Sequence, residues 1–191
     1  MRGMVFLVLL VLVTLVSSAS AVTVIDFEDA SPGDLPSDYY LDEGVLIGGP
    51  VGAQVWGYDF SNTCTSGDWY SPLEFTFVVP GDASTPGMTN YVALYNWFGP
   101  GNGFETDWWI VSAYDWTGDL IETKTLVGDG WLTFEACDIH KVVLDDVDNT
   151  AFAMDNLTFN SPTAAPGLPA IALVGAAPAL GAVVRGLRRR R

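Results

Sequence analysis

Short runs of β-branched and aromatic residues, each closed by glycine, proline, aspartate or asparagine, fill positions 22–160. Valine, threonine and aromatic side chains fit strands, whereas the closing residues fit turns. No long stretch of this region has the period of an amphipathic helix. The pattern predicts an all-β domain over 22–160, folded as a two-sheet antiparallel β-sandwich of the jelly-roll type.

The clearest strand signal is the alternating run 73–79, and the clearest hairpin joins the runs 108–114 and 120–126. The five residues 115–119 between those runs are typical of a tight turn. Shorter runs indicate further strands at 22–28, 45–47, 53–60, 91–98, 131–135, 139–144 and 151–159. Positions 29–43 and 61–71 are polar or rich in turn residues, so we expect loops there.

The first 21 residues have the organisation of a secretory signal peptide. Arg2 precedes an apolar run over 4–16, and Ala19 and Ala21 have the small-residue spacing that signal peptidase requires. The run is about 13 residues long, which is too short for an ordinary membrane-spanning helix. We therefore expect residues 1–21 to be removed, and an uncleaved signal anchor is the alternative.

The other end of the chain predicts a membrane anchor. Positions 161–169 are rich in proline and alanine and should form an extended linker. Positions 170–184 carry no charge, and 185–191 contain five arginines. Because arginine is costly in hydrocarbon, we expect a C-terminal transmembrane helix over 170–184 with its basic tail on the cytoplasmic side. A disordered basic tail is the alternative.

This order of linker, apolar span and arginine cluster resembles the PEP-CTERM class of bacterial sorting signals, in its Val-Pro-Leu-Pro-Ala variant. Pro166, Leu168 and Pro169 stand at the motif positions, although no Pro-Glu-Pro is present. The resemblance implies recognition by an exosortase-type transpeptidase at the membrane. It also implies export to the cell envelope, the cell surface or an extracellular matrix.

The domain itself resembles the galactose-binding-like jelly rolls of carbohydrate-binding modules, in its opening segment 24–29 and its closing segment 153–159. That resemblance implies a structural calcium ion between the first and last strands, with Glu28 and Asp155 as ligands and Asp26 beside them. Asp155 also shares strand parity with Leu157 and Phe159, so it should point toward the core and need a cation or N–H donors. A turn capped by Asp155 is the alternative.

The charge balance limits the partners of the domain. All 23 acidic residues of the chain lie within 22–160, against only Lys124 and Lys141, a formal charge of about −21. Such a surface repels nucleic acid and attracts divalent cations. Solubility or salt adaptation alone would also explain it.

Cys64 and Cys137 are the only cysteines. In an exported protein an even pair predicts a disulfide, and two free thiols are the alternative.

Tryptophans are the candidate ligand-binding residues, because a flat ring stacks on the face of a sugar while polar neighbours fix its orientation. We expect Trp109, one of an adjacent pair, and Trp116, at a hairpin tip, to bind polysaccharide. Trp97, Trp108 and Trp131 are further candidates, and burial in the core is the alternative for each.

Catalysis has little support in the sequence. His140 is the only histidine and lies in an alternating strand, and neither G-x-S-x-G nor H-E-x-x-H occurs. We therefore expect a non-enzymatic, exported cell-surface or matrix protein. The alternative is a carbohydrate-binding module that tethers the cell to polysaccharide.

Mass spectrometry of the protein from its native host should find a mature N-terminus at Val22, because the small-residue site ends at Ala21. The same spectra show whether the C-terminal segment is retained or removed. An intact chain from Met1 to Arg191 in the cytosol would contradict export.

Overall fold

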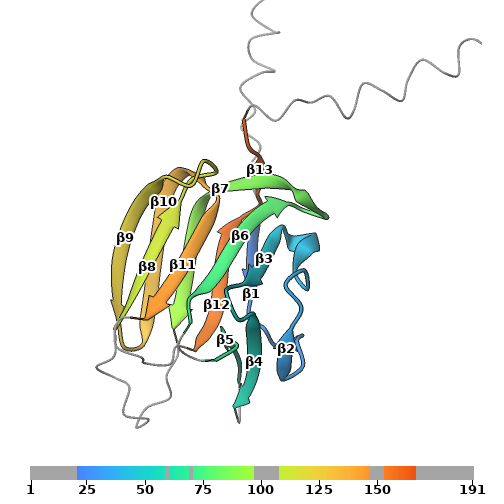
Figure 1. Cartoon of the computed structure of the whole chain (residues 1–191), viewed down its shortest axis with the longest axis vertical. Helices are drawn as coiled ribbons and strands as arrows, with labels where there is room; N and C mark the ends of the chain where they lie inside the picture. The colour runs from blue at the N-terminus through green and yellow to red at the C-terminus, as the bar shows by residue number, and fades with distance from the viewer. Residues whose placement is uncertain (1–20, 59–60, 69–70, 97–107, 147–152, 167–191) are drawn as a thin grey trace, which may run out of the picture.

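The computed structural model describes residues 21–58, 61–68, 71–96, 108–146 and 153–166 (Figure 1). Strands make up almost all of the regular structure there, beside one turn of 3-10 helix over Leu41–Glu43. The all-β, antiparallel prediction is confirmed. In these ranges no helix has the length and apolar character needed to span a bilayer. The predicted signal peptide and the segments 170–184 and 185–191 lie outside the described residues.

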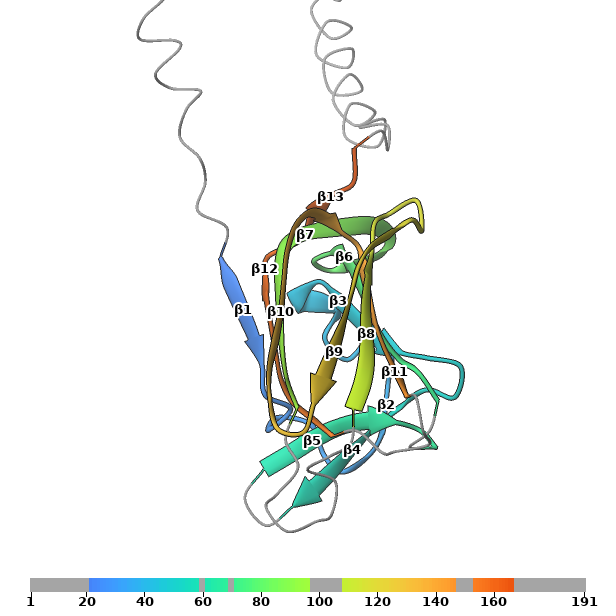
Figure 2. The same cartoon turned by 90° about the vertical axis from the view of Figure 1, so that its left-hand side faces the viewer.

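The strands form two facing layers, as Figure 2 shows for β12, β10 and β1 against β8 and β11. The first layer has the order β10 (Gly130–Ile139), β7 (Asp82–Asn96), β12 (Met154–Asn160) and β1 (Val22–Ile25). The start of β12 also pairs with β5 (Ser61–Ser66), which continues into β4 (Ala53–Tyr58) and β2 (Gly33–Leu35).

The second layer has the order β3 (Val45–Gly48), β6 (Leu73–Val79), β11 (Lys141–Asp146), β8 (Trp108–Tyr114) and β9 (Leu120–Val127). The layers are joined where β6 turns into β7, and the short β13 (Thr163–Ala164) pairs with β7 beyond that junction. All of these pairings are antiparallel.

Large aromatic side chains from both layers fill the space between them. Phe134 and Phe159 come from the first layer, and Phe75, Phe77 and Trp109 from the second, each at most 1% exposed. The rings of Phe77 and Phe159 meet across the interface, with centroids 5.1 Å apart. Truncating a buried ring of this size costs about 3–5 kcal/mol, so this contact is a main source of stability.

Two strands occur where the sequence predicted loops. β5 lies within the expected loop 61–71, and β2 within 29–43. β5 is polar in composition, yet residues 63–66 are each 0% exposed. Hydrophobic alternation, the usual strand signal, is therefore absent from a strand that is buried on both faces.

β7 begins nine residues before the predicted strand 91–98. Its first part contains Pro86 and Gly87, and proline and glycine are depleted in strands. Pro86 is in register with Val78 at the junction of the layers. A side chain at position 87 would place its Cβ 2.5 Å from the carbonyl group of Val78, so this close approach requires glycine.

The domain extends past residue 160. The Ser161 amide donates to the Ala21 carbonyl at 2.7 Å, and the Ala165 amide donates to the Pro86 carbonyl at 3.0 Å. Ala165 is 4% exposed. Residues 161–165, predicted as part of the linker 161–169, therefore pack on the sandwich. Pro166 is exposed, and Leu168 and Pro169 of the predicted sorting motif lie outside the described residues.

The predicted disulfide between Cys64 and Cys137 is wrong, because both cysteines are free. Cys64 pairs with Met154, at the Asn96 end of β7, whereas Cys137 lies on β10 between the partners of Tyr91 and Thr89. The two positions are roughly 20 Å apart along the strands. A disulfide needs α-carbons within about 7 Å of each other, so the fold excludes this pairing.

A thiol reagent should label Cys137 in the folded protein and Cys64 only after unfolding. Cys64 is fully buried and Cys137 is exposed, and burial raises the pKa of the Cys64 thiol, which disfavours the reactive thiolate. Mass spectrometry of alkylated peptides measures each site, with Cys137→Ser as the control. A disulfide-linked peptide containing both cysteines would contradict the fold.

Candidate functional site

The outward-facing side of the β10–β7–β12–β1 layer, called here the outer face, carries a stacked aromatic pair. Trp131 of β10 is 57% exposed, and its register partner on β7 is Tyr95. The two ring centroids lie 5.1 Å apart with the planes tilted by 37°. A tryptophan held in this way on a surface is a rigid, open apolar platform.

The strand registers place polar side chains beside this pair. Asn156 of β12 is opposite Tyr95, and the next outward row contains Thr133, Ala93 and Thr158. Outward rows are about 7 Å apart along a strand, and neighbouring strands about 4.8 Å apart.

The remaining outer-face residues complete two rows. They are Val24 in the row of Thr158, and Glu135, Tyr91, Asn160 and Val22 in the following row. The face thus combines flat rings with amide and hydroxyl groups.

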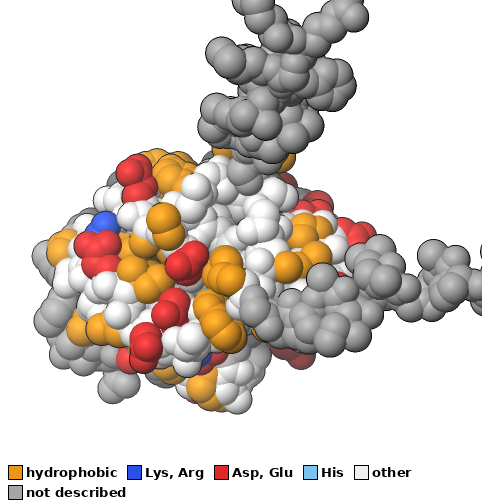
Figure 3. Space-filling model, turned by 90° about the horizontal axis from the view of Figure 1, so that it is seen from above, with side chains coloured by type: hydrophobic (Ala, Val, Ile, Leu, Met, Phe, Trp, Pro, Cys, Tyr) orange, Lys and Arg blue, Asp and Glu red, His pale blue; other side chains and the backbone are white. Residues whose placement is uncertain are grey.

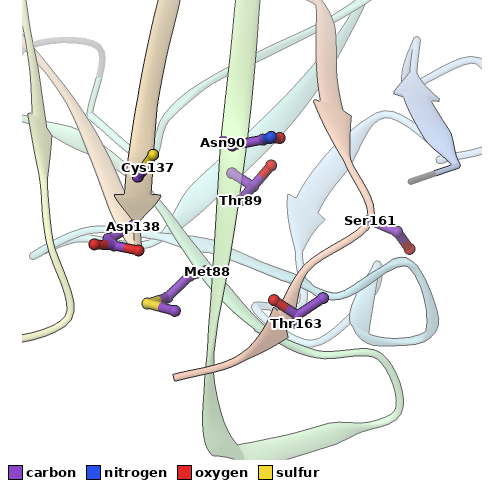
Figure 4. Close-up of a pocket in the computed structure, with 7 residues that line it drawn as sticks. All are labelled: Met88, Thr89, Asn90, Cys137, Asp138, Ser161 and Thr163. Atoms are coloured by element: carbon purple, nitrogen blue, oxygen red, sulfur yellow. The ribbon is translucent and has the colours of Figure 1, made fainter. Parts of the chain in front are cut away.

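The outer face ends in a hollow of about 220 Å³ where β10, β7 and the segment after β12 diverge (Figure 4). It is lined by Met88, Thr89, Asn90, Cys137, Asp138, Ser161 and Thr163. The opening coincides with a register shift in β10 between Glu135 and Ile139, and Asp138 has a φ of 82°. The bulge therefore shapes this end of the face.

Hydrogen bonds hold the polar groups of the hollow in place. The Asn160 amide donates from Nδ2 to Oδ1 of Asn90 at 2.7 Å, and the Thr89 hydroxyl donates to the Asn160 carbonyl at 2.8 Å. These bonds connect β7 to the end of β12, so the wall of the hollow is preorganised.

Positive charge is scarce in the part of the chain that the structure describes. Its two lysines both pair with glutamates of the second layer: Lys124 with Glu122 at 3.1 Å and Lys141 with Glu74 at 3.5 Å. The β13 end of the sandwich shows acidic side chains interspersed with apolar patches and few basic ones (Figure 3). The outer face itself contains Glu135 and no lysine.

The structure corrects one predicted ligand-binding residue. Trp109 is 1% exposed and belongs to the core, so it offers no ring face to a ligand. Trp131, only a secondary candidate in the sequence, is the tryptophan on the outer face. The missed signal was its strand parity, because Trp131 alternates with the apolar Leu132 and Phe134 and shares a side with polar residues.

Trp116 lies at the predicted hairpin tip and is 41% exposed. The tip is fixed by Asp115, whose carboxylate accepts from the Thr117 hydroxyl at 2.7 Å and from the Asp119 amide at 2.9 Å. The bond from the Thr117 side chain lowers the pKa of Asp115. The hairpin belongs to the second layer, so the fold does not bring Trp116 to the outer face.

The predicted calcium ligands occupy different roles in the described structure. Asp26 accepts from the backbone N–H of Glu28 at 3.2 Å, and Glu28 accepts from the backbone N–H of Asn62 in β5 at 2.8 Å, so both carboxylates bind backbone N–H groups. The register of β12 shifts at Asp155, and Met154 takes the buried position instead. Asp155 is half-buried at this shift, so strand parity does not fix the direction of its side chain, and its inward orientation stays a prediction.

No group of three or more potential metal-ligating side chains occurs among the residues that the structure describes. Calcium binding by Glu28, Asp155 and Asp26 therefore stays a prediction from the resemblance.

No family model matches the chain, and no curated protein matches it. Similar solved structures include a family two carbohydrate esterase from Cellvibrio japonicus, with 14% identity and a TM-score of 0.37 over 79% of this chain and 37% of that one. The chain thus spans little more than a third of the length of the esterase.

Two carbohydrate-binding modules are also similar. The family 22 module of Clostridium thermocellum Xyn10B has 15% identity and a TM-score of 0.35, over 72% of this chain and 99% of that one. A family 28 module, specific for non-crystalline cellulose, has 13% identity and a TM-score of 0.34, over 72% and 90%.

The calcium prediction has a direct test by chelation. An ion that binds only the folded state at a hundred times its Kd adds about 2.7 kcal/mol to the free energy of unfolding, so a chelator should lower the melting temperature. Thermal unfolding of the full chain with EDTA and with added calcium measures the difference. Identical curves would reject a structural calcium ion.

Proposed function

We propose that the chain is an exported, non-enzymatic protein of the cell surface or extracellular matrix, and that its sandwich binds polysaccharide through the outer face. The observation that carries the proposal is the exposed Trp131 stacked on Tyr95 beside a row of amide and hydroxyl side chains. A side chain this large and apolar is costly to leave in water unless a partner covers it.

The chemistry of the outer face fits a sugar better than a protein partner. The carbon-bound hydrogens of a pyranose give it apolar faces that lie flat on Trp131 or Tyr95. Its hydroxyl groups then need donors and acceptors at the edges, which Asn156, Thr133 and Thr158 supply. A protein interface would instead have an apolar centre with a polar rim.

The non-enzymatic part of the proposal rests on the kinds of group present. The indole, phenol, amide and hydroxyl side chains of this face bind and orient a ligand but need an activating partner to act as general bases, and the carboxylate of Glu135 lies two rows away from Trp131. His140, the only histidine of the sequence, has its Nδ1 atom 2.8 Å from the Gly87 carbonyl oxygen and lies outside the outer face.

Display at the surface rests on the sequence of the two ends. We propose that a transpeptidase of the exosortase type and the membrane are the partners of segment 166–191, while the acidic sandwich remains outside the cell. Polysaccharide is then the partner of the outer face, and nucleic acid is disfavoured by the charge of the domain.

Replacing Trp131 by alanine should weaken polysaccharide binding by roughly thirtyfold, because truncating a central aromatic anchor costs about 2 kcal/mol or more. Affinity gel electrophoresis of the full chain on a panel of polysaccharides measures the change. Trp116→Ala is the matched control, since it removes a comparably exposed tryptophan from the other layer. Both variants should melt at the temperature of the natural protein.

Equal losses in the two tryptophan variants would contradict the site. If the natural chain binds no polysaccharide but is retained in the matrix of its host, the sandwich has a purely structural role and the binding proposal fails.

A further inference from the structure

The outer face runs without interruption from the aromatic pair to the hollow. Along β10, Trp131, Thr133, Glu135 and Cys137 alternate with Leu132 and Phe134, which are 6% and 1% exposed. Ala136 packs against the core and Cys137 is exposed, so Cys137 points to the same side as Trp131, and the hollow that it lines opens on the outer face. Six residues separate the two, a distance of about 20 Å.

The hollow is too small to enclose a whole small-molecule ligand. Pockets that enclose a whole small molecule have volumes of about 300–1,000 Å³, whereas this hollow measures about 220 Å³. Its lining surface is mostly apolar, and Asn90, Ser161 and Thr163 contribute polar groups beside Met88 (Figure 4). A mostly apolar hollow with a few polar groups is suited to one sugar ring, which has apolar faces and hydroxyl edges, while the rest of the ligand lies along the strands.

The shape of the face favours the middle of a chain over its end. At one limit stands Trp131, which is more than half exposed, and at the other the hollow lies where the strands diverge. A site for chain ends encloses the terminal ring on several sides, whereas the described strands around Trp131 form an open sheet surface.

The charge of the face selects among polymers. Glu135 lies in the row next to the hollow, and Asp138 lines the hollow. The two lysines of the described residues pair with glutamates in the other layer, and Lys124 also donates to the Thr133 backbone carbonyl at 2.6 Å. Carboxylated or sulfated polysaccharides would be repelled from these carboxylates.

We infer that the outer face binds an internal segment of a neutral polysaccharide, which lies along β10 and β7 from Trp131 to the hollow beside Asp138 and Thr163. This inference rests on the proposed function and adds to it the length, charge and direction of the ligand. The hollow is the subsite most distant from the aromatic pair.

The test uses the full chain, first on gels containing hydroxyethylcellulose, xylan or galactomannan as neutral polymers and alginate or polygalacturonate as anionic ones. Calorimetry then follows oligosaccharides of the polymer that binds, from disaccharide to hexasaccharide. We expect retardation on a neutral polymer only, and an affinity at least tenfold higher for the hexasaccharide than for the disaccharide.

Two substitutions by tryptophan measure the contribution of the hollow separately from that of the rest of the face. Thr163→Trp fills the hollow from an exposed position and should remove most of the advantage of the hexasaccharide while leaving disaccharide binding unchanged. Thr125→Trp, at an exposed position of β9 in the second layer, is the matched control and should bind like the natural chain.

The outcomes distinguish the inference from the function on which it rests. Affinity that does not depend on length, binding to anionic polymers, or a Thr163→Trp variant with an unchanged length dependence would overturn the inference while polysaccharide binding stands. Failure to bind any of the polymers would overturn both.

Discussion

The packing of Phe159 against Phe77 fixes which sides of β12 and β6 face inward. Each ring belongs to one layer, and both are fully buried. Because successive side chains of a strand point to opposite faces, a slip of one residue in β12 would move Phe159 into water and turn its outward neighbours into the core. The inward-facing residues thus decide which residues of the same strands form the outer face. The outward side chains are positioned by the packing of their inward neighbours.

Local departures from this alternation shape the two ends of the outer face. In β12 the register shifts at Asp155, so that Met154 is buried and Asn156 points outward beside Tyr95. In β10 the shift between Glu135 and Ile139 opens the hollow. Each bulge inserts residues into one strand and changes the direction of nearby side chains, while the packing beyond it is undisturbed.

β6 could be predicted from the sequence because alternation gives it one apolar side, and the β8–β9 hairpin because turn residues separate its two strands. β5 could not, since its neighbours bury both of its sides and it needs no apolar pattern. The same limit applied to the site. Alternation in the sequence distinguishes the two sides of a strand. It does not tell which strand is the neighbour, so the sequence could not show that the outward Trp131 lies beside another ring. The predicted disulfide between Cys64 and Cys137 was wrong for a related reason. The number of residues between two cysteines does not tell where strand pairing places them in the sheet.

The segment after β12 lines the hollow and then leaves the sandwich at Pro166, whereas Trp131 lies at the opposite end of β10. If the tail attaches the protein to the envelope, the hollow is the end nearest the cell and the indole ring the end farthest from it. A bound polymer would then stand upright on the surface instead of lying flat against it. Neighbouring copies would then hold their polysaccharide chains parallel to one another, and the direction of β10 would set the orientation of these chains relative to the cell surface.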